Sequence, residues 1–167
     1  MTTLAQLLGR GPVSIQKITI TNQPGYTTNH TIAAVDLSRS AVFIGTIGAI
    51  KSGINSSPVG CARLTSANNI ETPSGAGVGA KITQDIYVVD FGLLVKSVQR
   101  GVMAATFDKG EAALAPVNPS RCIVTLMRNM TEARDVNTTH QVTSDKLTIT
   151  WGSNTVGNLH WQVIEFY

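Results

Sequence analysis

The sequence predicts an all-β protein: two tandem, similar antiparallel β-sandwich units that follow a short N-terminal arm. Three observations lead to this fold class. Only 14% of the 167 residues are charged, and Thr, Ser, Asn and Gly supply much of the polarity, which favours strands and turns. Helix-forming residues at helical spacing are missing, apart from the short stretch TLAQLLGRG near the start. Finally, segments of the first half of the chain recur in the same order in the second half.

The repeat consists of four pairs of segments. Four correspondences in one order are hard to produce by accident, so they indicate a tandem duplication. The pair Ala33–Ile44 and Ala115–Leu126 has five identities in twelve positions. The other pairs are SIQKITIT (14–21) with SVQRGVMA (97–104), RLTSANNI (63–70) with QVTSDKLT (141–148), and IYVVDFG (86–92) with WQVIEFY (161–167).

These pairs divide the chain into an N-terminal arm at 1–13 and β-sandwich repeats at 14–92 and 97–167. The connection LLVK at 93–96 is short and mainly apolar. We therefore expect the two units to pack closely or to share a sheet.

Each unit contains several strand patterns. Alternation of polar and apolar residues predicts half-buried strands, whereas continuous apolar runs predict strands buried on both sides. Strands at this spacing, without helical crossovers, are typical of antiparallel sandwiches. The alternating segments are SIQKITIT, HTIAAVDL (ending near Asp36), LTIT (147–150) and HWQVIEFY (160–167), and the apolar runs are SAVFIGTIGAI (40–50) and CIVTLM (122–127).

VDLSRS and VNPSRC predict the same corner in both units. The side chains of Asp36 and Asn118 are expected to accept hydrogen bonds from backbone N–H groups two residues on. Pro119 suits the second position of a type I turn.

Other paired polar residues also favour structural roles. Arg39 and Arg121, just after the corners, are expected to bond loop carbonyls or the acids near the ends of the units, because a guanidinium suits several acceptors. Gln16 and Gln99 are expected to form cross-sheet hydrogen bonds.

No motif supports catalysis, so we expect no enzyme activity, no catalytic residues, no cofactor and no metal site. SGAGVGAK (74–81) fits neither phosphate-loop spacing and reads as a hairpin tip, and VVDFG reads as a strand end. His30, His140 and His160 have no metal-ligand spacing, and no triad can be assembled from local spacing. The sequence leaves open whether Cys61 and Cys122 are free or bridged.

The charge pattern argues against a nucleic-acid partner. The net charge is +3, but the thirteen Lys and Arg are scattered singly. No apolar stretch approaches the length of a membrane span, and the start lacks a signal-peptide pattern, so we expect a soluble protein made in the cytoplasm.

The second unit resembles a module of tailed-bacteriophage structural proteins. It carries SVQRG (97–101), APVNPSRCIVTL (115–126), LTITW (147–151) and the final WQVIEFY, where that module has a V-Q-R-G strand, a V-[ND]-P-[AS]-[KR] corner and a V-x-E-[FY] strand. The first unit fits more loosely, because Lys17 and Ile18 replace the Arg and Gly of the opening strand.

The resemblance implies a non-enzymatic virion component, assembled in the host cytoplasm. We expect a capsid decoration protein that contacts the major capsid or tail protein and copies of itself, and the resemblance suggests a trimer. Leu4, Leu7 and Leu8 of the arm are candidates for docking on a neighbour, although they could equally pack on their own chain. Stable contacts of this kind need about 800 Å² per partner.

The alternative is a tail or fibre accessory protein that binds a host receptor or glycan. Sugar-binding sandwiches expose aromatic platforms, and Trp151 is the candidate platform here, since Trp161 alternates with expected core residues. A small hydrolase would need an acid pair or triad that the sequence does not display.

Overall fold

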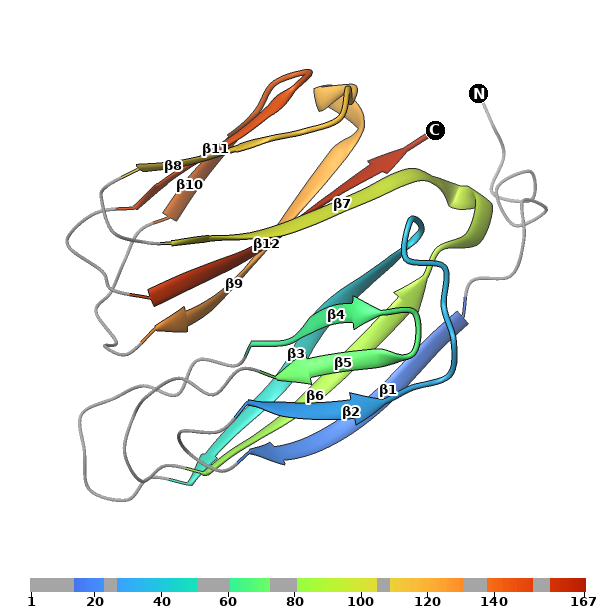
Figure 1. Cartoon of the computed structure of the whole chain (residues 1–167), viewed down its shortest axis with the longest axis vertical. Helices are drawn as coiled ribbons and strands as arrows, with labels where there is room; N and C mark the ends of the chain where they lie inside the picture. The colour runs from blue at the N-terminus through green and yellow to red at the C-terminus, as the bar shows by residue number, and fades with distance from the viewer. Residues whose placement is uncertain are drawn as a thin grey trace.

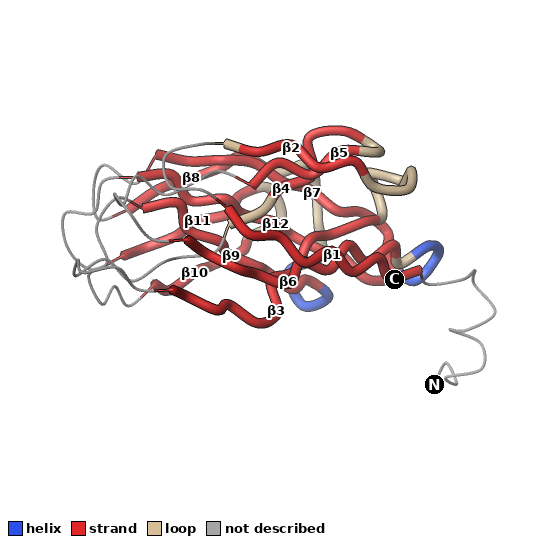
Figure 2. The backbone as a smooth tube through the Cα atoms, turned by 90° about the horizontal axis from the view of Figure 1, so that it is seen from below, coloured by secondary structure: helices blue, strands red, loops and turns tan. Residues whose placement is uncertain are grey.

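The computed structural model describes residues 14–22, 27–50, 61–72, 81–104, 109–130, 138–151 and 157–167. Strands dominate this part of the chain, with two short 3-10 helices between them (Figure 2). The predicted arm at 1–13 and the predicted hairpin tip at 74–80 lie outside the described residues. Within the described ranges, no helix is long and apolar enough to cross a membrane.

The first unit is a sandwich of two three-stranded antiparallel sheets, ordered β1-β6-β3 and β2-β5-β4. Figure 1 shows the short β2, β4 and β5 lying over the long β1, β3 and β6. Its strands are β1 (Ser14–Asn22), β2 (Thr28–Thr31), β3 (Ser40–Ile50), β4 (Arg63–Ser66), β5 (Asn69–Thr72) and β6 (Lys81–Asp90).

The second unit repeats this plan strand for strand, with sheets ordered β7-β12-β9 and β10-β11-β8. The predicted class of two tandem, similar antiparallel units is therefore confirmed. Its elements are η1 (Gly92–Leu94), β7 (Val95–Ala104), β8 (Lys109–Ala113), η2 (Pro119–Arg121), β9 (Cys122–Met130), β10 (Thr138–Val142), β11 (Lys146–Trp151) and β12 (Gly157–Phe166). The predicted linker at 93–96 thus forms the end of η1 and the first two residues of β7.

The strand registers place the repeated segments at matching positions. Asp90 pairs with Ser14 and Ser40, just as Glu165 pairs with Ser97 and Cys122. One paired segment departs from this rule, because β4 contains a register shift between Leu64 and Ser66. The structural equivalence of RLTSANNI and QVTSDKLT therefore follows the sequence alignment at their first residues. After the register shift, the equivalent residues are offset by one position.

Two strand predictions need correction. The predicted strand HTIAAVDL ends early, since β2 stops at Thr31. The following segment is instead held by the backbone N–H groups of Ile32 and Val35, which donate to the carbonyls of Asn68 and Ala67. The apolar runs of β3 and β9 both form edge strands. The start of β3 is buried on both faces as predicted, since the adjacent residues Ala41 and Val42 are 0% exposed, whereas β9 is not, because its Ile123 is 53% exposed.

Each sandwich has its own apolar core. The first is built on buried aliphatic residues such as Ile70, Ile86 and Val88. The second contains Trp151 and Trp161 as well as aliphatic residues. Burial of these side chains supplies the main free energy that stabilises each unit.

One exchange explains why the opening strands of the units differ. A Cβ atom added at Gly101 would lie 2.5 Å from Cζ2 of Trp161, so the ring fills the space that a side chain would need. In the first unit the paired positions are Ile18 and Ile86. The second core therefore contains Gly101 and Trp161 where the first core contains Ile18 and Ile86. This exchange accounts for the loose fit of the first unit to the V-Q-R-G pattern.

Candidate functional site

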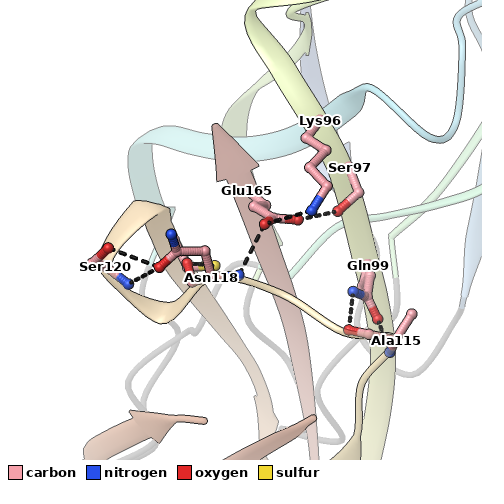
Figure 3. Close-up of polar contacts among 8 residues, drawn as sticks. Lys96, Ser97, Gln99, Ala115, Asn118, Ser120 and Glu165 are labelled. Carbon is pink, nitrogen blue, oxygen red and sulfur yellow. Dashed lines mark hydrogen bonds and ion pairs between the residues drawn. The ribbon is translucent and has the colours of Figure 1, made fainter. Parts of the chain in front are cut away.

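The corner between β8 and β9 is held by Glu165 of β12 (Figure 3). Glu165 is 1% exposed. Its Oε1 accepts hydrogen bonds from the backbone N–H of Asn118 (2.9 Å) and from Nζ of Lys96 (3.0 Å), and Ser97 Oγ donates to its Oε2 (3.3 Å). Burial acts to raise the pKa of the Glu165 carboxyl, but the Asn118 amide and the Lys96 ammonium outweigh it, so the pKa is lowered. The carboxylate is therefore charged at neutral pH.

The first unit builds the same corner with Asp90, a shorter acid, in place of Glu165 and with Asp36 in place of Asn118. Asp90 accepts from the backbone N–H of Asp36 (3.5 Å) and of Gly92 (2.9 Å). Asp36 in turn accepts from the N–H and Oγ of Ser38 at 2.9 and 2.7 Å. In the second unit Asn118 accepts from the N–H and Oγ of Ser120 at 3.2 and 2.8 Å, which confirms the predicted side-chain turn in both units.

The paired glutamines also have matching contacts. Gln16 exchanges two hydrogen bonds with the backbone of Ala33 (3.0 and 2.8 Å), and Gln99 does the same with Ala115 (3.0 and 2.7 Å). Figure 3 shows the second of these pairs beside the corner. The two glutamines form hydrogen bonds as expected, but these bonds join the opening strand to the connecting segment after β2 or β8 rather than to a strand of the other sheet. They hold the start of each corner in place.

The arginine after the first corner pairs with a different acid from the one expected. Nε of Arg39 lies 3.7 Å from the carboxylate of Asp36, within its own corner rather than at the end of the unit. Arg121 is exposed. The repeated sequence motifs therefore mark structural positions, and a functional surface has to be sought elsewhere.

The two units meet at a junction that the sequence did not reveal. Here β3 of the first unit meets the outer face of the β7-β12-β9 sheet. Gln162 accepts from the backbone N–H of Val42 (2.9 Å), and its Nε2 donates to the Val42 carbonyl (2.7 Å) and to Thr125 Oγ1 (2.8 Å). Because β3 is an edge strand, this carboxamide pairs backbone groups that a neighbouring strand would otherwise pair.

Further hydrogen bonds join the second unit to the corner that precedes β3 in the first unit. The backbone N–H of Val98 donates to the Ser38 carbonyl (2.7 Å). Nη2 of Arg100 donates to the carbonyls of Leu37 and Ser40, the latter at 2.6 Å. The junction thus consists largely of side chains of one unit that bind the backbone of the other.

Apolar contacts accompany these hydrogen bonds. Ala41 of β3 packs in one buried cluster with Val95, Val98 and Ile164 of the second unit. Three aromatic rings flank the cluster in edge-to-face pairs, with centroids 6.3 Å apart for Phe43 and Phe91 and 6.0 Å apart for Phe91 and Phe166. Such pairs stabilise a contact beyond the area they bury.

A cavity of about 320 Å³ lies at the same junction. The first unit lines it with β4 residues such as Arg63 and Thr65, and the second with Arg100, His160 and Trp161. This volume is large enough for a small ligand.

His160 is the unusual residue of this cavity. It is 4% exposed, and neither ring nitrogen has a hydrogen-bond partner among the described residues. Burial lowers the pKa of His160 to about 4, and the charge of Arg63 adds to this effect, whereas Glu71 opposes it. The imidazole is therefore neutral at pH 7. Its position on the junction side of β12 could not be read from the sequence, which gave only isolated histidines.

The ionisable groups in and near the cavity differ in their pairing and protonation. Arg63 is already paired with Glu71. Among the residues that the structure describes, no three His, Cys, Asp or Glu side chains gather to hold a metal ion. Cys61 and Cys122 are both free, and burial raises the pKa of the Cys61 thiol to about 12, so Cys61 stays protonated.

The predicted contact residues have separate outcomes. Leu4, Leu7 and Leu8 lie outside the described residues. Trp151 is 2% exposed and packs in the second core, which contradicts its interpretation as a ligand platform. A Cβ atom added at Gly110 would lie 2.7 Å from this ring, so the backbone of β8 covers one side of it. Trp161 is buried as expected.

Large apolar side chains are nevertheless exposed. Ile15 and Ile123 are 64% and 53% exposed, and both lie on long strands of the two units. Single exposed apolar residues are ordinary on protein surfaces, so these two gain meaning only from their positions in the repeated units.

Comparison with known proteins gave no match to any protein-family model, curated protein or solved structure.

Proposed function

We propose that the protein is a non-enzymatic structural component of a bacteriophage particle, and specifically a capsid decoration protein that stabilises the shell through protein–protein contacts. The observation that carries the proposal concerns the phage-like motifs of residues 97–167. Their key residues, Asn118 and Glu165, form one hydrogen-bond network that the first unit repeats with Asp36 and Asp90. A duplicated unit of this kind extends a surface instead of adding a reaction centre.

The chemistry of the junction supports a contact role. The first unit binds the second through edge-strand backbone, a glutamine carboxamide, an arginine and an apolar cluster. These are the ordinary means by which protein surfaces recognise each other. The proposed partners are the major capsid protein and further copies of the chain, with no nucleic acid or membrane involved, and the arm with Leu4, Leu7 and Leu8 is the proposed anchor.

Copy number and position in purified particles test the proposal. Quantitative mass spectrometry should find the protein in a fixed ratio to the major capsid protein, and immunogold labelling should place it over the head. Particles made without the gene should lose DNA at a lower temperature, and added purified protein should restore their stability. Absence from mature particles would contradict the proposal.

The tail-accessory alternative is supported by one observation, the cavity lined by Trp161, His160 and Arg63. In that role the protein would bind a receptor or glycan at the tail, in a few copies per particle. A glycan array should then give binding that Val102→Trp, at the lining of the cavity, abolishes and that Leu93→Lys, on η1, leaves unchanged. Trp151→Ala does not serve here, because it would disturb the core.

A further inference from the structure

We propose that copies of this chain associate head to tail, and that the contact between copies repeats the junction between the two units within each copy. The β9 edge of one copy would dock on the outer face of β1 and β6 in the next. The partner is therefore a second copy of the same chain. The inference goes beyond the virion role and does not depend on it.

The junction within the chain has two different sides. The edge side belongs to the first unit and consists of the corner and the start of β3, including Ser38, Ala41 and Val42. The face side belongs to the second unit and is centred on Val98 and Ile164, with Arg100 and Gln162 beside them. Each unit thus uses only one of the two sides within a single chain.

Strand register identifies the unused counterparts. Ile15 lies opposite Val89, as Val98 lies opposite Ile164. Ile123 lies opposite Ile164, as Ala41 lies opposite Val89. Ile15 is therefore the face-side counterpart of Val98, and Ile123 is the edge-side counterpart of Ala41.

The exposure of these counterparts, at positions equivalent to buried residues of the junction, is what indicates a missing partner. Val98 is 8% exposed and Ala41 is fully buried, whereas Ile15 and Ile123 are 64% and 53% exposed. The two unused sides thus carry larger apolar side chains than the used ones, and these side chains face solvent. Each head-to-tail contact would cover Ile15 of one copy and Ile123 of the other, so a ring or filament of copies covers both sides.

One of the two polar counterparts suits the same contact, whereas the other, Tyr87 at the position of Gln162, lacks the carboxamide. Lys17 takes the place of Arg100, since it lies opposite Tyr87 as Arg100 lies opposite Gln162. Its side chain is 50% exposed and its Nζ lies 2.9 Å from the Asp85 carboxylate, so further N–H groups remain to donate. The docked corner would offer the carbonyls of Pro119 and Cys122, which match those of Leu37 and Ser40.

The two junctions do not compete for the same residues. In the first unit, Ala41 belongs to the edge side that the chain uses internally, and Ile15 belongs to the unused face side. In the second unit, Val98 belongs to the used face side and Ile123 to the unused edge side. Such a contact is heterologous, so it closes into a ring or continues as a filament according to its rotation. The sheet faces and strand edges that the contact needs are present on every copy.

Charge exchange tests the pairing of Ile15 with Ile123. We expect the wild-type protein to form oligomers at about 100 µM in native mass spectrometry and light scattering. Ile15→Lys and Ile123→Glu should each raise the dissociation constant at least about tenfold, because each buries a charge in the contact. The double variant Ile15→Lys/Ile123→Glu should recover association, since the two charges then face each other in every contact.

Leu93→Lys is the matched control, because Leu93 is an exposed apolar residue on η1 outside both sides. It should leave the oligomer unchanged, and circular dichroism should show all variants folded. A monomeric wild type, or single variants that dissociate while the double variant fails to recover, would overturn the proposal. In a Cys122→Ser background, Ile15→Cys mixed with Ile123→Cys should form an intermolecular disulfide that neither variant forms alone, and crosslinking of a single variant with itself would contradict a head-to-tail contact.

Discussion

Gln162 shows how one side chain can replace a strand at a sheet edge. Its carboxamide offers one donor and one acceptor at a spacing that satisfies both backbone groups of Val42, a residue of the other unit. In the first unit Tyr87 stands at the corresponding place. The two hydrogen bonds that Gln162 makes to an edge strand therefore have no equivalent on the β1-β6-β3 face, where Lys17 is the polar side chain available to a docked edge.

Replacing Gln162 with Leu should destabilise the protein by about 2–4 kcal/mol, because the N–H and carbonyl of Val42 would remain buried without partners. Urea unfolding measures the change. Gln141→Leu, at an exposed position on β10, is the control and should shift stability by less than about 0.5 kcal/mol. Equal effects of the two substitutions would argue against the proposed role of the carboxamide.

His160 links the junction to pH. Its pKa in the folded protein is about 4, below the ordinary value of 6.5, because the ring is buried at the junction and Arg63 lies nearby. As pH falls from 6.5 to 4, the unfolded chain therefore binds a proton that the folded chain does not. Stability is highest above this window and declines through it.

We expect the free energy of unfolding to be about 2 kcal/mol lower at pH 5 than at pH 7.5 on account of His160. Carboxylates with lowered pKa values, such as Glu165, contribute mainly below about 4.5, and burial also lowers the pKa of His30, which adds a smaller decline in the same window. His160→Leu should remove most of the pH dependence between 5 and 7.5, as measured by urea unfolding at both pH values. An unchanged slope in the variant would show that His160 is not the responsible group.

Among the elements, β7 and β12 fill their part of the second core with different side chains from those that β1 and β6 supply in the first core. Gly101 and Trp161 fill the space that Ile18 and Ile86 fill in the first unit. The total volume matters more than either side chain alone, because interiors are closely packed.

Gly101→Ile alone should cost about 1–3 kcal/mol through overpacking, and Trp161→Ile alone about 2–3 kcal/mol through the cavity it leaves. The double variant copies the first unit, so its cost should fall below the sum by at least about 1 kcal/mol. Thermal and urea unfolding measure these values. Gly101→Ile combined with Ile70→Val, in the other core, should be additive, and additivity in both pairs would contradict the exchange.

The sequence predicted well those elements whose hydrogen-bond partners lie close in the sequence and occur in both repeats. The corners at Asp36 and Asn118 and the glutamine contacts were predictable, because local hydrogen-bond chemistry and the repeat both indicate them. The same signals could not show that β3 and β9 are edge strands, or that the outer face is covered at Ala41 of β3 and open at Ile123 of β9, since an apolar run has the same pattern in each case.

The junction was harder to predict for a physical reason. Val42 and Gln162 are 120 residues apart, and the glutamine has no counterpart in the first unit, so the repeat gives no signal for it. Trp151 was misread because a tryptophan near a strand end has no local pattern that distinguishes a platform from a core residue. The cavity at His160 depends on how two sheets meet, which pattern analysis of single strands does not describe.

At the scale of the whole molecule, duplication has produced two similar units that differ at their contact surfaces. One junction is satisfied within the chain, and the unused sides carry exposed Ile15 and Ile123. This arrangement suits a protein that extends a lattice, whether its neighbours are further copies or the shell beneath them.

Cryo-electron microscopy of purified particles tests this account most directly. We predict density for the two-unit fold at regular positions over the head, with Ile123 of one copy against Ile15 of the next. Density confined to the tail tip, or isolated copies whose β1 and β9 edges face solvent, would contradict it.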